Sequence, residues 1–277
     1  MNQNQLFDAN MAKRHPIQIL LVDDNAINLK VASRMLLRMG YEVDQATNGC
    51  EAVEAQRDKG YDLIFMDIQM PEMDGVTATK HIISEFAEDR PRIVAVTAHA
   101  MKGDRERYLD AGMDGYISKP VRVERLIEEI EETPCKEAVE ALTNIGIATL
   151  GANQVVAQPA PAAPSPVDLM TFADMLGMDL EDAEEMLPEL IELFIDDSTD
   201  QITQMKMAID TLDFDLLRNA SHKMKGGAAS VAALPLSKLC GEIETMGLNQ
   251  VVAGADTVYQ NICNEFDRLK AWFQESS

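Results

Sequence analysis

The first half of the chain alternates short apolar runs with longer segments in which apolar residues recur at helical spacing. The short runs are predicted to be buried strands at 17–22, 41–44, 61–67, 92–97 and 115–118. The longer segments are predicted to be helices at 27–39, 49–59, 75–88, 104–111 and 121–132. Because parallel neighbouring strands need crossover connections, this order indicates an α/β domain with a five-stranded, doubly wound parallel sheet.

The second half of the chain shows helical spacing and no strand pattern. Helices are predicted at 168–175, 184–209, 214–231, 235–246 and 251–273. The last four are long and have short connections, which is typical of an antiparallel four-helix bundle.

A connecting segment separates the two patterns. Residues 154–166 are rich in proline and alanine, a composition that favours an extended linker without a core of its own. For residues 136–150 two interpretations stay open, a further amphipathic helix and a spacer. We therefore predict an α/β domain over 16–132, a connection over 133–167 and an all-α domain over 168–277.

Charge and composition narrow the classes of partner. The formal net charge is −23, and nucleic-acid binding through a basic face needs clusters of Lys and Arg that this sequence lacks. The four cysteines have no metal-binding spacing. No run of about 18 apolar residues occurs, and the first 15 residues lack the apolar core of a signal peptide. We expect a cytoplasmic protein that binds neither nucleic acid nor membrane.

Polar residues collect where the predicted strands end. Asp23 and Asp24 follow the first strand, Asp67 ends the third, Thr97 ends the fourth and Lys119 follows the fifth. Ligands of open parallel sheets bind at this carboxyl edge. Three carboxylates in one place need a cation, and hard oxygen ligands favour Mg²⁺. The pattern predicts metal-dependent phosphate chemistry.

Each member of this group has an expected role. Asp67 is the predicted nucleophile towards a phosphoryl group, and Lys119 is expected to neutralise charge on the phosphoryl oxygens. Asp23 and Asp24 are the expected metal ligands, together with the backbone carbonyl of Gln69 and with Asp67 itself.

These motifs, in order and at this spacing, resemble the receiver domain of two-component response regulators. The residues that carry the resemblance are Val22-Asp23-Asp24-Asn25, Met66 to Gly75, Thr97-Ala98 and Lys119-Pro120. The resemblance implies a flavodoxin-like fold and an aspartyl phosphate at Asp67 that is received from a sensor histidine kinase. It also implies that Thr97 and Tyr116 form the switch that responds to phosphorylation.

A second candidate lies in the predicted helix 214–231. Two adjacent glycines, Gly226 and Gly227, follow His222. In a helix interior each glycine lowers helix stability by about 1 kcal/mol relative to alanine. Gly226 and Ala229, at i+4 and i+7 on the same face as His222, are expected to leave the imidazole exposed to another protein. A neutral imidazole is a competent nucleophile towards an acyl phosphate. Lys223 and Lys225 are expected to balance phosphate charge.

The stretch from His222 to Gly226, with Leu239-Cys240 and Glu244 to Gly247 downstream, resembles the histidine-containing phosphotransfer (HPt) domain. The resemblance covers about residues 168–275 and implies a phosphorylatable His222 on a four-helix bundle. One departure is Ala232, ten residues after the histidine, where the family often has glycine.

Together these features predict a phosphorelay protein that accepts a phosphoryl group on Asp67 from a sensor histidine kinase and relays phosphoryl groups through His222 to or from a receiver aspartate. No ATP-binding kinase segment is recognisable, so the chain is expected to carry phosphoryl groups rather than to make them. Two alternatives are a Mg²⁺-dependent aspartyl-phosphate phosphatase and an interaction module without transfer at His222. The phosphatase commonly has a second aspartate two residues after the nucleophile, where this chain has Gln69. The direction of transfer, and contact between both domains of one chain, stay open.

Overall fold

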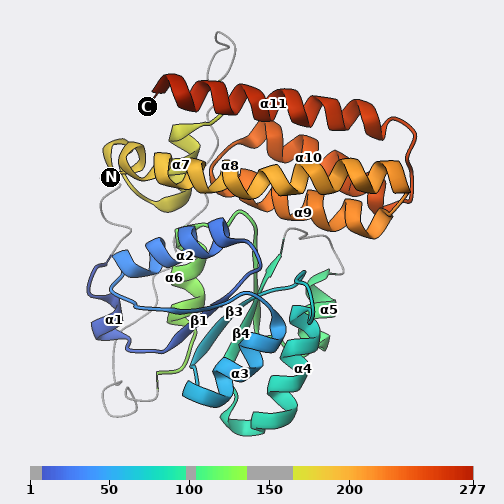
Figure 1. The fold of residues 1–277 in the computed structure, drawn as a ribbon. Coiled ribbons are helices and arrows are strands. Elements are labelled where there is room, and N and C mark those ends of the chain that lie inside the picture. Colours follow the sequence, from blue (N-terminus) through green and yellow to red (C-terminus); the bar gives the residue numbers. More distant parts are fainter. Residues whose placement is uncertain (1–7, 98–103, 136–164, 277) are drawn as a thin grey trace.

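A computed structural model of the chain describes residues 8–97, 104–135 and 165–276. Ala98 lies outside these residues. So does the segment 136–150, whose two interpretations are a helix and a spacer. The described part forms two domains, an α/β domain with a central sheet and a bundle of helices that lies against it (Figure 1). The α/β domain is called the receiver domain below, after the resemblance described above.

The receiver domain is built on one parallel sheet. Its strands are β1 (Ile19–Val22), β2 (Asp44–Ala46), β3 (Leu63–Asp67), β4 (Arg92–Thr97) and β5 (Gly115–Ser118), in the order β2-β1-β3-β4-β5. Every pair within this order is parallel. The predicted five-stranded, doubly wound fold is therefore confirmed.

The second strand begins later than the apolar pattern predicts. Its pairing with β1 runs from Asp44 to Ala46 rather than over 41–44. Tyr41 is buried, and its hydroxyl donates a hydrogen bond of 2.8 Å to the backbone carbonyl of His15. The apolar character of this segment thus reflects packing in the core and not strand pairing.

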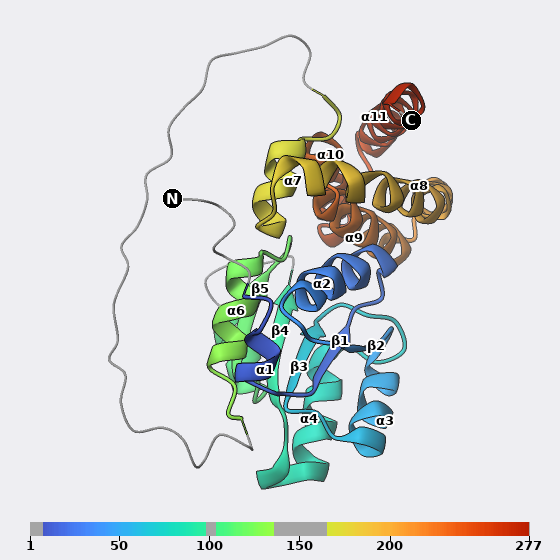
Figure 2. The ribbon, with the colours of Figure 1, turned by 90° about the vertical axis from the view of Figure 1, so that its left-hand side faces the viewer.

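Helices cover both faces of the sheet (Figure 2). They are α1 (Met11–Arg14), α2 (Ala26–Arg38), α3 (Gly49–Lys59), α4 (Gly75–Phe86) with a 3₁₀ turn at Ala87–Asp89, α5 (Asp104–Asp110) and α6 (Val123–Glu131). Alternate residues of each strand point to opposite faces. In β3, Leu63 and Phe65 pack with α2 and α6, whereas Ile64 and Met66 pack with α3 and α4.

The second domain contains α7 (Leu169–Leu176), α8 (Leu180–Thr211), α9 (Phe214–Ser230), α10 (Leu234–Leu248) and α11 (Ala255–Ser276). The last four are the long helices of the bundle, as predicted. Asp179 and Asp213 cap α8 and α9 by accepting hydrogen bonds from backbone N–H groups. None of the helices in the described ranges combines the length and the apolar character needed to cross a bilayer.

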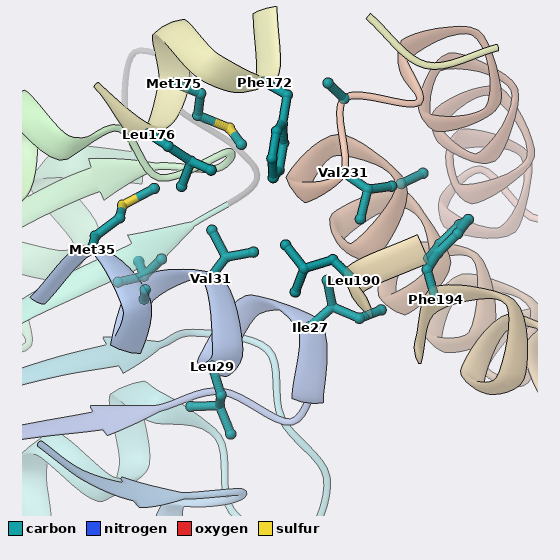
Figure 3. Packing of buried hydrophobic residues seen from close by; sticks show 14 of the residues in the cluster. Ile27, Leu29, Val31, Met35, Phe172, Met175, Leu176, Leu190, Phe194 and Val231 are labelled. Carbon is teal, nitrogen blue, oxygen red and sulfur yellow. The ribbon is translucent and has the colours of Figure 1, made fainter. Parts of the chain in front are cut away.

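The two domains share one hydrophobic core. The α2 helix packs against α8 and α9, and one continuous cluster of buried residues extends from the sheet into the bundle. Figure 3 shows Ile27 and Val31 of α2 beside Leu190 of α8, with Met35 close to Leu176 of α7. The helix α2 therefore buries one side against the sheet and another against the bundle.

Ion pairs surround this shared core. Basic side chains of the receiver meet acidic side chains of the second domain in four pairs, Lys30 and Arg34 with Glu189, Arg38 with Asp182, and Arg122 with Asp174. All of these side chains are substantially exposed, so each pair contributes little to stability. Their common polarity still favours one orientation of the two domains.

Candidate functional site

The carboxyl edge of the sheet brings the predicted acidic residues and lysine together. Lys119, which follows β5, donates a hydrogen bond of 2.7 Å to Asp67 Oδ2 at the end of β3. The same Nζ atom lies 2.7 Å from Asp23 Oδ2, after β1. Because β1 and β3 are neighbours, one ammonium group bridges two buried carboxylates. This is the pocket that the strand-end pattern predicts.

Burial and mutual repulsion raise the pKa of two of these carboxyl groups. Desolvation raises the pKa of Asp67 to about 7, against the attraction of Lys119. Desolvation and the charge of Asp23 raise the pKa of Asp24 to about 6. The negative charge of the pocket is therefore only partly compensated by Lys119.

This chemistry fits a divalent cation. One carboxylate oxygen from each of Asp23, Asp24 and Asp67 lies within 4.8 Å of the others. Three hard oxygen donors with unfavourable mutual repulsion are a suitable ligand set for Mg²⁺. At Gln69 the backbone N–H lies 3.3 Å from Asp67 Oδ1. That the Gln69 carbonyl is a ligand stays a prediction.

The two predicted switch residues have different surroundings. Thr97 is buried, and its hydroxyl lies 3.1 Å from the hydroxyl of Tyr108 on α5. Tyr116 is half-buried, with the guanidinium of Arg105 5.9 Å from the centre of its ring. Tyr108 was not anticipated, because a tyrosine in a short helix carries no distinctive motif. It connects the strand-end hydroxyl directly to α5.

Gly75 explains why a glycine ends the motif that follows Asp67. A Cβ atom added there would lie 2.0 Å from the backbone oxygen of Asp67, which no side chain allows. The neighbouring Asp74 caps α4 by accepting a hydrogen bond of 2.7 Å from Thr77 N–H. The close start of α4 thus holds the loop after Asp67 in place.

His222 lies in a buried hydrogen-bonded network. Its Nδ1 atom is 2.6 Å from Glu244 Oε1, and Lys225 Nζ donates to Glu244 Oε2 at 2.5 Å. Burial lowers the pKa of His222 below its usual value, despite the attraction of Glu244. Burial alone would raise the pKa of Glu244, but hydrogen bonds and charges from His222 and Lys225 lower it to about 2. The network favours a neutral imidazole beside an ionised carboxylate.

The expectation of an exposed imidazole is wrong for this arrangement of domains. His222 is only 8% exposed. The receiver lies against the same side of α9, since Asn25 Nδ2 donates a hydrogen bond of 3.0 Å to the backbone oxygen of Lys223. Sequence reasoning on the bundle alone had no means of including this second surface.

Replacing Glu244 with glutamine should destabilise the protein most at pH values above the ordinary glutamate pKa of 4.5. The folded carboxyl group has a lower pKa than the unfolded one, so its contribution is complete above that value and is lost as the pH falls towards about 2. Loss of a charged, buried hydrogen-bond acceptor is expected to cost about 1–3 kcal/mol.

Chemical unfolding of the wild type and Glu244→Gln, at neutral and at acidic pH, measures this difference. Glu242→Gln changes an exposed glutamate of the same helix and serves as the control. A deficit that does not shrink on acidification would contradict the low pKa of Glu244.

Two asparagines at the start of α2 connect the carboxylate pocket to α9. Asn25 caps α2 through its Oδ1 atom while its Nδ2 group reaches Lys223. Asn28 donates through Nδ2 to both oxygens of Asp23, at 3.0 and 3.2 Å. Its Oδ1 atom accepts a hydrogen bond of 2.8 Å from Ser230. Asn28 therefore contacts the predicted metal site and the bundle at once.

The glycine pair of α9 allows this close approach, and its two members differ. A Cβ atom at Gly227 would lie 3.1 Å from Ile27 Cδ1, 3.1 Å from Phe194 Cδ2 and 3.2 Å from Asn25 Nδ2. A Cβ atom at Gly226 would lie 3.4 Å from Asn28 Nδ2, an ordinary contact. Gly227 is therefore the more constrained of the two positions.

Gly226→Ala should stabilise the protein, and Gly227→Ala should not. Each change gains about 1 kcal/mol of helix propensity. Only the second forces side chains of both domains apart, so the gain is expected to be cancelled or reversed. The two variants are matched in helix and in chemistry, and their free energies of unfolding compare them directly. Equal stabilisation of both would show that the contacts at Gly227 relax without cost.

Ala232 follows α9 with a φ angle of 54°, a left-handed conformation that glycine adopts more easily. This accounts for the glycine that is common at this position of HPt domains. The backbone oxygen of Ala232 accepts a hydrogen bond of 3.2 Å from Asp168 N–H, which ties the end of α9 to the start of α7.

Comparisons with known proteins identify both domains. The family model described as the response regulator receiver domain matches residues 19–131, and the model described as the Hpt domain matches residues 189–272. The polar-differentiation response regulator DivK of Brucella anthropi is 41% identical over 116 residues, which cover 42% of this chain and 94% of DivK.

Two further matches are to parts of sensor kinases. The signal transduction histidine-protein kinase BarA of Escherichia coli K12 is 40% identical over 124 residues, which cover 45% of this chain but only 14% of BarA. A crystal structure of the receiver domain of the sensor histidine kinase PA1611 from Pseudomonas aeruginosa, with magnesium in its active site cleft, is 38% identical. The match covers 42% of this chain and 96% of the chain in that structure, with a TM-score of 0.40.

The predicted fusion of two domains is thus confirmed. The chain belongs to the family of response regulator receiver proteins and, through the Hpt domain that follows its receiver, is a phosphorelay signalling protein.

Proposed function

We propose that the chain receives phosphoryl groups on Asp67 from a sensor histidine kinase and exchanges them with His222 of the same chain. The observation that supports this most strongly is the set of hydrogen bonds by which Asn25 and Asn28 join the carboxylate pocket to α9. Lys119 pairs with Asp67, and its charge also contributes to the lowered pKa of His222. Asn25, next to the acidic pair at 23–24, donates to the helix turn that carries His222.

The residues of the pocket have two proposed roles, binding of the metal ion and neutralisation of charge on the phosphoryl group. Asp23, Asp24, Asp67 and the carbonyl of Gln69 would hold Mg²⁺, whose charge, when bound, offsets that of the phosphoryl oxygens. Lys119 supplies a second positive charge. The attraction of Asp23 and Asp67 raises the pKa of Lys119 although burial opposes this, so the amine stays protonated.

The hydrogen bond with Glu244 prepares the imidazole of His222 for phosphoryl transfer. With the proton held on Nδ1 by Glu244, the lone pair of the neutral ring is on Nε2. In transfer from Asp67, a bond forms between Nε2 and phosphorus while the bond between Asp67 Oδ and phosphorus breaks. The released carboxylate is stabilised by Lys119. The reverse transfer breaks the N–P bond and forms the O–P bond, and Nδ1 keeps its proton in both directions.

The two lysines on α9 assist in different ways. Lys225 is engaged with Glu244, so it acts through the carboxylate that orients His222. Lys223 Nζ lies 3.3 Å from Asp197 Oδ1, and its charge reaches Asp24 and opposes the rise in the pKa of that group. Lys223 is therefore a lysine of the bundle whose charge bears on the carboxylate pocket.

Other receiver-domain proteins are the expected partners of His222, and the cytoplasm is the expected location. Both follow from the proposed chemistry, because a phosphohistidine needs a receiver aspartate as donor or acceptor and the upstream donor is a sensor kinase.

The test is whether label reaches His222 through Asp67. Wild-type chain incubated with radiolabelled acetyl phosphate and Mg²⁺ should gain an acid-labile, base-stable label at His222. Asp67→Ala should remove this label, and exposed Asp58→Ala should not. Transfer within one chain should also proceed at a rate per chain that does not change on dilution. Label at His222 that forms equally fast in Asp67→Ala would show that Asp67 is not the donor.

A further inference from the structure

The side of the bundle that carries His222 is covered by a receiver domain. His222 is 8% exposed, and α2 of the receiver packs on its helix, α9, at Lys223, Gly227 and Ser230. The contact is polar at its centre, where Asn25 and Asn28 bond to α9. It is apolar beside this centre, where Ile27 and Val31 meet Leu190.

The fit depends on features that another receiver of the same class can also provide. Because Gly227 has no side chain, an apolar side chain of a receiver, such as Ile27, can pack directly against α9. A Cβ atom at position 227 would crowd that side chain. The acidic side chains of Asp182 and Glu189 flank this surface and pair with basic residues of α2. The partner that suits this surface is a receiver whose corresponding helix has an apolar face flanked by Lys or Arg.

Two receivers cannot occupy the same surface. We propose that the bundle face around His222 takes one receiver at a time, and that the receiver of this chain excludes those of other proteins from it. This rests on the proposed role of His222 as a phosphoryl carrier. Exchange with a second protein then requires the two domains of this chain to separate, while exchange with Asp67 requires them to meet.

Covalent connection makes the chain's own receiver a strong competitor. A domain joined covalently to another, by a connection that can span the two sites, acts at an effective concentration that can reach the order of millimolar. If the face is free in roughly one chain in ten, the apparent affinity for an outside receiver falls about tenfold. Loss of the internal contact should therefore speed transfer from another molecule without any change in the bundle itself.

Transfer between two copies of the full chain provides the test. The donor copy carries His222→Gln, is phosphorylated on Asp67 with acetyl phosphate and is then freed of the reagent. The acceptor copies carry Asp67→Ala, so that they take label only from the donor. One acceptor has no further change, a second has Val31→Glu in the contact, and a third has Leu37→Glu. Leu37 is on the same helix and 53% exposed, whereas Val31 is 3% exposed.

The acceptor with Val31→Glu should gain base-stable label up to about tenfold faster than the other two, which should match each other. A fourth acceptor, with Lys30→Glu and Arg34→Glu, reverses exposed charges at the contact and should also be faster, even if Val31→Glu fails to fold. Equal rates in all acceptors would overturn the competition. Absence of base-stable label from every acceptor would instead refute the carrier role of His222.

Discussion

A chain in which glutamine replaces His222 should carry phosphoryl label only at Asp67. Wild type is expected to show two kinds of label with opposite stability, an acyl phosphate that base destroys and a phosphohistidine that acid destroys. The glutamine side chain is similar in length to histidine, and its amide N–H group can donate a hydrogen bond to Glu244, which His222 contacts at 2.6 Å. Its amide nitrogen is not a nucleophile. The expected result is complete loss of the base-stable label with the fold retained.

The matched control for this change is His81→Gln. His81 is an exposed histidine on α4, in the receiver domain, and its replacement should leave both kinds of label at the wild-type level. Label on tryptic peptides after acid and base treatment measures the outcome. Base-stable label that persists in His222→Gln would place the carrier at another nucleophile.

Replacing Lys119 with methionine should nearly abolish phosphorylation of Asp67. The ammonium group lies 2.7 Å from one oxygen of Asp67 and 2.7 Å from one of Asp23, and both carboxylates are buried. Removal of one preorganised positive group that faces developing charge typically slows a reaction about 10²–10³-fold. Methionine fills a similar volume, so the loss is expected to come from charge rather than from packing.

Stability should fall as well, because two buried carboxylates lose their counter-charge. Removal of one partner of a buried ion pair typically costs about 3–5 kcal/mol. The contrasting control is Lys59→Met, which removes an exposed pair with Asp44 at 2.8 Å. Such a surface pair contributes about 0–1 kcal/mol. Rates of phosphorylation by acetyl phosphate, together with unfolding in urea, test both parts. Wild-type rates in Lys119→Met would exclude Lys119 from the transfer.

The carboxylate pocket was predictable because its chemistry follows from local patterns. Each of Asp23, Asp67 and Lys119 ends or follows an apolar run, and parallel strands must bring such positions to one edge of the sheet. The presence of five strands and of the five helices of the second domain follows from the same periodicity. The strand β2 was predicted too early in the sequence. Tyr41 is buried by packing in the core and does not pair with β1.

Contacts between the two domains were not predictable in the same way. Val31 and Leu190 have the helical spacing of ordinary core residues, and their sequence does not show that each faces the other's domain. Asn28 looks like an ordinary polar residue of a helix, although it joins Asp23 to Ser230. The signal that was present is the glycine pair of α9, whose cost in helix stability indicates that something packs closely there.

The continuous cluster of buried residues also has a thermodynamic consequence. A core that belongs to two domains makes the stability of each depend on the other. Heat or denaturant should therefore unfold receiver and bundle in a single cooperative transition while they are in contact, and in two transitions once the contact is broken. An event that weakens the contact, such as a charge added at the edge of the sheet, would then be detectable as a loss of cooperativity at helices far from that charge.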